Sequence, residues 1–187
     1  MQVRFSTCRG MAVVEEENGE FVGALGDPLI HPDTGFIEGF SVWVSGILRS
    51  EEVFCSGQDI LRWGMVVTVR HRGVLGPVAD CVRLQPLLED PRTVLRQRIR
   101  TENGKERGKC ADIQFDTEAL RVTWLFPRKF LKWGIAIPLS EVLEVREDAI
   151  IVRDPPAMQE EPVHPVRAVK ALEAIQDIAD SGVARPS

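Results

Sequence analysis

Apolar and polar residues alternate along most of the chain, and this period of two predicts β-strands with one buried face. Two Asn-Gly pairs, Asn18-Gly19 and Asn103-Gly104, lie between such runs. Asn and Gly adopt the positive φ angles of a tight hairpin turn at little cost, so residues 11–14 should pair with 21–25 and residues 98–101 with 107–113. Further strands are expected at residues 36–44, 65–69, 120–126, 134–138 and 149–152. Many short strands at close spacing predict an all-β fold of small barrels.

The two hairpins belong to an internal repeat. Residues 14–23 align with residues 99–108 at a shift of 85, which places Asn18, Gly19, Gly23 and Asp27 on Asn103, Gly104, Gly108 and Asp112. Gly23 and Gly108 fall inside strands, where glycine usually marks a bulge, and Asp27 and Asp112 are expected to end those strands. Residues 61–67 align with 131–137 at a shift of 70, so the first copy should carry about 15 extra residues within 43–58.

A period of 3.6 residues replaces the alternation near the C-terminus. A linker rich in Pro and Glu is followed by Pro165, which is placed to open a helix. The apolar stripe of that helix comprises Val166, Val169, Leu172, Ile175, Ile178 and Ala179, with Gly182 as its cap. We therefore expect domains at 1–84 and 85–154, followed at 155–187 by the linker and a short amphipathic helix. The stripe fits either the chain's own barrel or a partner.

Composition places the chain among soluble globular proteins. Of its 187 residues, 44% are hydrophobic and 27% are charged, which excludes a disordered, collagenous or disulfide-dense chain. No apolar run is long enough for a membrane span, and the first ten residues lack the pattern of a signal peptide. We expect a cytoplasmic protein with no transmembrane segment.

The net charge of −5 hides an asymmetry along the chain. Residues 11–60 contain ten acidic residues and one basic residue, whereas residues 61–140 contain fifteen basic and eight acidic residues. Opposite charges of −9 and +7 on the two segments either attract each other within the molecule or select different partners.

Motifs for catalysis, metals and cofactors are absent from the sequence. The four cysteines form no C-x-x-C pair, and the three histidines have no serine or cysteine nucleophile motif beside them. His31 and Asp33 offer two metal ligands where a site needs three or four, and the glycines form no phosphate-binding loop. We expect a protein that is not an enzyme, with no catalytic residue, cofactor or metal.

The segment 120–140 combines basic and aromatic residues and contains no acidic residue. Its basic residues Arg121, Arg128, Lys129 and Lys132 alternate with Trp124, Phe126, Phe130 and Trp133. This combination suits RNA, an anionic membrane surface or an acidic protein, and the four basic residues are our candidates for partner binding. Alternatively, the rings fill the second barrel and the cations lie in a solvated turn.

The duplicated pattern resembles the PRC-barrel family. The first copy carries the resemblance in residues 10–13, Asn18-Gly19, Gly23, Asp27 and Gly35, and the second in residues 103–116, 137–142 and 147–152. The resemblance covers most of residues 5–152 and implies two tandem small PRC-type β-barrels. Pro28, His31 and Pro32 depart from it, because proline interrupts the strand expected after Asp27.

Similar domains occur in the photosynthetic reaction-centre H subunit, in the ribosome-maturation factor RimM, and in small prokaryotic proteins that include archaeal cell-division adaptors. In these proteins the barrel is a docking module and not a catalyst. The resemblance therefore implies a non-enzymatic adaptor or assembly protein that docks a protein partner. The alternative is a RimM-like ribosome-assembly factor that binds a ribosomal protein or rRNA through the basic second barrel.

Overall fold

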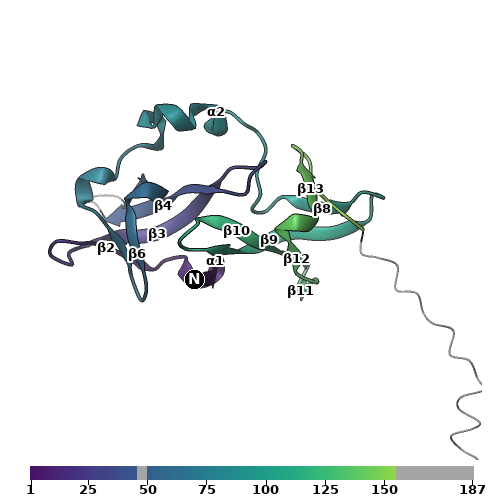
Figure 1. Ribbon diagram of the computed structural model, residues 1–187, viewed down its shortest axis with the longest axis horizontal. Helices are drawn as coiled ribbons and strands as arrows, with labels where there is room; N and C mark the ends of the chain where they lie inside the picture. The colour runs from purple at the N-terminus through teal and green to yellow at the C-terminus, as the bar shows by residue number, and fades with distance from the viewer. Residues whose placement is uncertain (46–49, 155–187) are drawn as a thin grey trace, which may run out of the picture. The chain divides into compact units, whose positions relative to one another are not determined.

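Two β-sheets joined by a long connector dominate the computed structural model (Figure 1). The structure describes residues 1–45 and 50–154. The stretch Met1–Asp154 forms one compact unit. The predicted C-terminal helix and its linker therefore lie outside the described residues. The fold class is mostly β, as the alternation predicts.

The first sheet has the strand order β5-β4-β3-β2-β7-β6. Its strands are β2 (Ala12–Glu15), β3 (Phe21–Ile30), β4 (Ile37–Ser45), β5 (Ser50–Ser56), β6 (Ile60–Trp63) and β7 (Val67–Val69). Neighbouring strands are antiparallel, except that β2 and β7 are parallel. The Asn18-Gly19 pair lies in the turn of the predicted β2–β3 hairpin.

The second sheet has the strand order β11-β10-β9-β8-β14-β13. Its strands are β8 (Arg98–Thr101), β9 (Glu106–Asp116), β10 (Arg121–Lys129), β11 (Lys132–Trp133), β13 (Val142–Val145) and β14 (Ile150–Val152). Two further short strands pair with inner strands of this sheet: β1 (Gln2–Arg4) pairs with β9, and β12 (Ile137–Pro138) pairs with β10. The N-terminal strand thus belongs to the sheet formed by the distant half of the chain, which the sequence pattern did not predict.

Short helical turns occupy the connector and the sheet ends. The α-helices are α1 (Phe5–Cys8) and α2 (Gln85–Leu88). The 3-10 turns span Gly57–Asp59, Arg72–Val74, Val78–Asp80, Val82–Leu84 and Leu139–Glu141. The connector between β7 and β8, with α2, runs over the first sheet (Figure 1). Within the described residues, no helix has the length and apolar character needed to cross a membrane.

The two sheets repeat each other strand by strand. The pair Leu25↔Val42 of β3–β4 has its counterpart in Cys110↔Pro127 of β9–β10, 85 residues later. The parallel pair β2–β7 corresponds to the parallel pair β8–β14. The edge strand β6 corresponds to the edge strand β13, which lies 82 residues later in the chain. The repeat predicted at a shift of 85 is therefore present in the backbone.

The second sequence match, at a shift of 70, is wrong. Residues 61–63 form the edge strand β6, whereas residues 131–133 belong to the β10–β11 hairpin, which has a different place in the sheet. Because the shift changes only from 85 to 82, the first copy is longer by about three residues and not 15. A similar run of Leu, Trp and Gly arose in two positions that are not equivalent.

Asp27 and Asp112 lie inside strands and do not end them, which corrects the prediction. The strands β3 and β9 continue to Ile30 and Asp116. Pro28 does not interrupt β3, because it lies where the register with β4 shifts, and a bulge needs no hydrogen bond from the missing N–H. The register also shifts opposite Gly23 and Gly108, as expected for bulge glycines.

One hydrophobic core serves both sheets. Val13 and Val67 of the first sheet belong to the same buried cluster as Ile99 and Ile113 of the second. Three aromatic rings link the sheets: Phe40, Trp63 and Phe115 lie with centroids 5.3 to 5.8 Å apart. In the described residues neither strand ladder closes on itself, so the architecture observed is two sheets around one core.

Candidate docking surface

The four predicted basic residues do not form one group. Arg128, Lys129 and Lys132 lie together at the β10–β11 hairpin. Arg121 begins the same strand, roughly 23 Å away at the rise of a β-strand. Its guanidinium donates a hydrogen bond of 3.2 Å to the carbonyl of Thr34 and lies 5.1 Å from the Phe36 ring centroid. Arg121 is thus engaged where the two sheets meet and does not belong to the hairpin.

The hairpin places two apolar residues at its tip. Lys129 pairs with Lys132, which leaves Phe130 and Leu131 as the turn. Phe130 has a φ of +54°, in the left-handed region that large side chains rarely occupy. Since its side chain is 90% exposed, burial within the described residues does not compensate for that conformation. A two-residue hairpin turn calls for positive φ, which Asn or Gly would adopt at less cost than phenylalanine.

Four apolar side chains of the hairpin are exposed together. The exposed fractions are 90% for Phe130, 85% for Leu131, 84% for Ile135 and 54% for Trp133. The alternative in which the rings fill the second barrel is wrong for Phe130 and Trp133; Trp124 is 38% exposed and Phe126 is half-buried. Leu131 and Ile135 were not predicted as site residues. Their signal was the run of apolar residues that breaks the alternation after Pro127.

Basic side chains surround these apolar residues. Arg107, Lys129 and Lys132 line an open hollow of about 470 Å³ together with Phe130, Leu131, Trp133 and Gly134. Within residues 1–45 and 50–154, no acidic side chain forms an ion pair with Arg107, Lys129 or Lys132. We call residues 128–135 together with Arg107 the hairpin surface. It combines exposed apolar area with uncompensated positive charge.

The N-terminal segment supports the base of the hairpin. The Arg4 guanidinium lies 4.0 Å from the Phe126 ring centroid and 5.2 Å from that of Trp133, and Arg128 lies 5.4 Å from Trp133. Arg4 is held in turn by Asp112, whose carboxylate is 2.8 Å from the Arg4 Nη2. Guanidinium groups thus already cover the aromatic faces of Phe126 and Trp133.

Asp112 is a buried anchor, although its pattern suggested only a turn residue. Its side chain is 1% exposed. Besides Arg4, it accepts hydrogen bonds from the Ser6 hydroxyl at 2.6 Å, the Ser6 N–H at 3.0 Å and the Ile113 N–H at 2.9 Å. Because a buried carboxylate needs such partners, Asp112 fixes α1 and Arg4 against β9.

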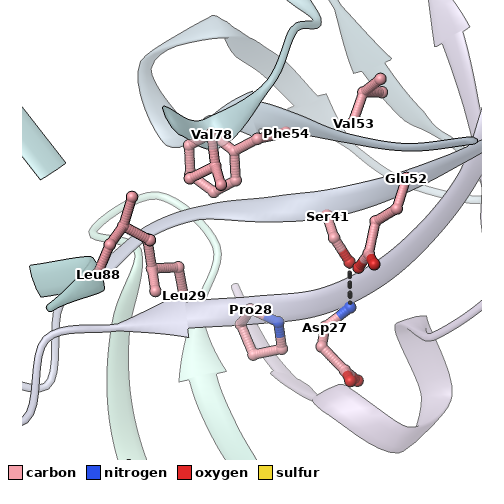
Figure 2. Close-up of a pocket in the computed structure, with 9 residues that line it drawn as sticks. All are labelled: Asp27, Pro28, Leu29, Ser41, Glu52, Val53, Phe54, Val78 and Leu88. Atoms are coloured by element: carbon pink, nitrogen blue, oxygen red, sulfur yellow. Dashed lines mark hydrogen bonds between the residues drawn. The ribbon is translucent and has the colours of Figure 1, made fainter. Parts of the chain in front are cut away.

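A second surface of different character lies on the first sheet (Figure 2). It is an apolar pocket of about 290 Å³ between the strands and the connector. Figure 2 shows Leu88 and Val78 of the connector opposite Leu29 and Phe54 of the sheet. The other lining residues are Asp27, Pro28, Ser41, Glu52 and Val53. The Ser41 hydroxyl accepts a hydrogen bond of 2.9 Å from the Asp27 N–H, which shapes the polar end of the pocket.

Three of the four described thiols are poor nucleophiles. Cys8, Cys55 and Cys110 are buried and Cys81 is half-buried. Burial raises the pKa of the Cys55 and Cys110 thiols to about 12, and that of Cys8 above its ordinary value. A protonated, buried thiol does not attack a substrate. In the part of the chain that the structure describes, no three His, Cys, Asp or Glu side chains converge as a metal site.

Asp33 and Asp90 share one arginine. Arg92 contacts Asp33 at 2.5 Å and Asp90 at 2.7 Å, and these hydrogen bonds hold the pKa of both carboxyl groups below their ordinary value. His31 accepts a hydrogen bond from the Asp33 N–H at 3.3 Å, so both predicted ligands belong to this turn. His164 lies outside the described residues. The cluster joins the connector to the first sheet.

No protein-family model matches this sequence, and no curated protein matches it.

Proposed function

We propose that the chain is a non-enzymatic adaptor that holds a protein partner in a larger assembly. The observation that carries the proposal is the presence of two separate surfaces, the apolar pocket of Figure 2 and the hairpin surface, where exposed apolar side chains lie among uncompensated cations. An apolar patch of this kind on a soluble domain usually marks a docking site, because leaving it in water is unfavourable.

An adaptor needs two attachment points, and the described residues offer two surfaces of different character. The hairpin surface is basic and carries highly exposed apolar side chains, whereas the pocket of Figure 2 is apolar and lies between the first sheet and the connector. A recessed apolar pocket suits the side chains of a protein segment that inserts anchors. We assign the protein partner to this pocket and keep the hairpin surface as the second attachment.

The family resemblance agrees with this role. The repeated strand order, the two Asn-Gly hairpins and the paired bulges at Gly23 and Gly108 support a duplicated PRC-barrel-like unit. We propose that the two sheets are tandem units of this kind, in which the barrel serves docking and not catalysis.

A RimM-like role with rRNA is the weaker alternative. Unpaired bases would stack on free aromatic faces, but Arg4 and Arg128 cover those of Phe126 and Trp133. Phe130 alone offers an exposed ring at the hairpin tip. The cations still suit phosphate, so RNA recovery is an outcome of the test below.

The test is affinity capture of the full chain from its own cells, with chemical crosslinking and mass spectrometry. Leu88→Asp places a charge in the pocket, and Val82→Asp is its matched control, because Val82 lies on the same connector, 82% exposed and outside the pocket. We expect Leu88→Asp to lose a defined protein partner that Val82→Asp retains. Equal recovery with both variants, or ribosomal proteins and rRNA as the main product, would overturn the proposal.

A further inference from the structure

We propose that the hairpin surface binds the surface of an anionic phospholipid bilayer, with Phe130 and Leu131 at the hairpin tip inserted below the headgroups. The inference rests on the proposed function only in taking the hairpin surface as a docking surface. It adds that the hairpin surface binds a lipid bilayer, which would place the adaptor and its protein partner at a membrane.

Shape is the first argument. Phe130, Leu131 and Ile135 are each more than four-fifths exposed, and the hollow that Phe130 and Leu131 line is open, so most of the surface of these side chains faces solvent. A protein partner would have to supply a matching cavity for each of them, whereas a fluid bilayer receives protruding side chains without a preformed shape. The two-residue turn also narrows the hairpin at its tip, so that few polar backbone groups enter with the apolar side chains.

The order of residues from the tip is the second argument. Phe130 and Leu131 form the tip, Lys129 and Lys132 follow as the next pair, and Arg128 and Trp133 form the pair behind them. Long basic side chains extend their charged ends to the phosphates while their methylene groups stay with apolar surface, and Trp favours the interface. The sequence of pairs thus matches the change from acyl chain to headgroup to water.

Charge complementarity is the third argument and selects anionic lipid. Arg107, Lys129 and Lys132 have no acidic partner within the described residues, and the sequence has no acid from Leu120 to Ser140. A basic residue close to an anionic membrane strengthens binding by about fivefold. Zwitterionic lipid alone would leave these cations without counter-charge.

The test is flotation of the full chain with vesicles of phosphatidylcholine, with and without about 30% phosphatidylglycerol. We expect binding to the anionic vesicles and little to phosphatidylcholine alone. The charge reversal of Lys129→Glu with Lys132→Glu should weaken binding by at least about 25-fold. Arg70→Glu with Lys105→Glu changes the net charge equally outside the hairpin surface and should have a much smaller effect.

Insertion is tested separately from electrostatic adsorption. Phe130→Asn with Leu131→Ser keeps every charge and suits the left-handed turn, so the fold should be retained; we expect binding to fall about tenfold or more. Met65→Ser is the matched control, since Met65 is 97% exposed at the turn between β6 and β7. Acyl chains brominated near the headgroup should quench the fluorescence of Trp133, and Trp133→Phe identifies that signal.

Each outcome bears on the proposal. Loss of binding in the charge reversal alone, with no effect of Phe130→Asn and Leu131→Ser, would show adsorption without insertion and overturn it. Absence of binding to anionic vesicles would overturn it as well. If the hairpin variants instead lose an acidic protein or RNA in affinity capture, the hairpin surface docks a macromolecule and not a membrane. The Leu88→Asp comparison tests the adaptor role independently, because Leu88 lies outside the hairpin surface.

Discussion

The two sheets share a backbone plan but fill it with different residues. Gly10 before the first sheet and Arg96 before the second have φ angles of +82° and +66°. Their N–H groups donate equivalent 2.7 Å hydrogen bonds, to the carbonyls of Leu25 and Cys110. Gly35 and Leu120 are a second pair of equivalent positions with positive φ angles, of +70° and +46°. Tertiary hydrogen bonds therefore impose the left-handed conformation whether or not the residue favours it.

The contact between the sheets is made twice in the backbone. The Ile37 N–H donates to the Leu120 carbonyl at 2.7 Å, and the Val122 N–H donates to the Gly35 carbonyl at 2.9 Å. These two bonds are equivalents under the shift of 85, so each sheet plays the same part toward the other.

The side chains at that contact are not the same on both sides. A Cβ atom on Gly35 would lie 2.6 Å from Leu139 Cδ2, and one on Gly57 would lie 2.5 Å from Leu120 Cδ1. Gly57 and Leu139 begin equivalent 3-10 turns. The first sheet thus supplies two glycines and the second sheet two leucines that fill the space above them. The repeated backbone was specialised into complementary halves.

The largest expected effect comes from filling one of these spaces. Gly35→Ala should lower the free energy of unfolding by about 3 kcal/mol, because it adds overpacking against Leu139 to the strain of a positive φ. Gly19→Ala is the control: its φ is +69° but no atom lies within 4 Å, so only about 1 kcal/mol is expected. Urea unfolding measures both.

A double variant sharpens the same comparison. Leu139→Ala should partly rescue Gly35→Ala, and the two changes should be non-additive by about 1 kcal/mol or more, because the side chains meet. Additive effects would show that steric contact between the sheets is not the cause.

The aspartates of the repeat differ in burial, and their replacement should differ accordingly. Asp112→Ala should cost about 2–3 kcal/mol, since Ser6 and Arg4 lose a buried acceptor. Asp27 is 41% exposed and contacts Arg9 at 3.5 Å and Arg96 at 3.1 Å, so Asp27→Ala should cost no more than about 1 kcal/mol. Equal losses in thermal unfolding would contradict the burial argument.

The positive-φ pair before the hairpins predicts a smaller effect, which should differ between the two positions. Gly10→Ala should destabilise by about 1 kcal/mol. Arg96→Gly relieves comparable strain but removes the exposed ion pair with Asp27, so its net effect should lie within about 0.5 kcal/mol of zero. A marked loss of stability in Arg96→Gly would show that the ion pair outweighs the strain.

The smallest expected effect is a pH dependence at the connector. Arg92 lowers the pKa of Asp33 and Asp90, so their contribution to stability is complete above the ordinary carboxyl pKa of about 4 and is lost as pH falls through the lowered values. Arg92→Gln should therefore flatten the fall of the thermal midpoint between about pH 5 and pH 2. Parallel curves for the two proteins would argue against this linkage.

Local sequence signals predicted the parts of the fold that neighbouring residues control. The Asn-Gly pairs and the alternation around them predicted both hairpins, and Gly23 and Gly108 predicted the bulges, because turns and bulges depend on φ preferences of a few residues. The mostly β fold class followed from the same period of two. The sequence grouped Arg128, Lys129 and Lys132 as candidate binding residues, and they do lie together because they are close in the chain and share one hairpin.

Long-range pairing decided what the sequence left open. The placement of β1 on β9, the anchoring of Arg4 by Asp112 and the separation of Arg121 from the hairpin surface depend on contacts between residues far apart in the chain. The exposure of Phe130, Leu131 and Ile135 has the same origin, because an apolar residue is buried only if the tertiary structure places another residue over it. The sequence alone thus predicted both hairpin turns, the charge and the longer strands, but not the edge strands β5, β6 and β13. The packing of the two sheets determined which side chains remain available for binding.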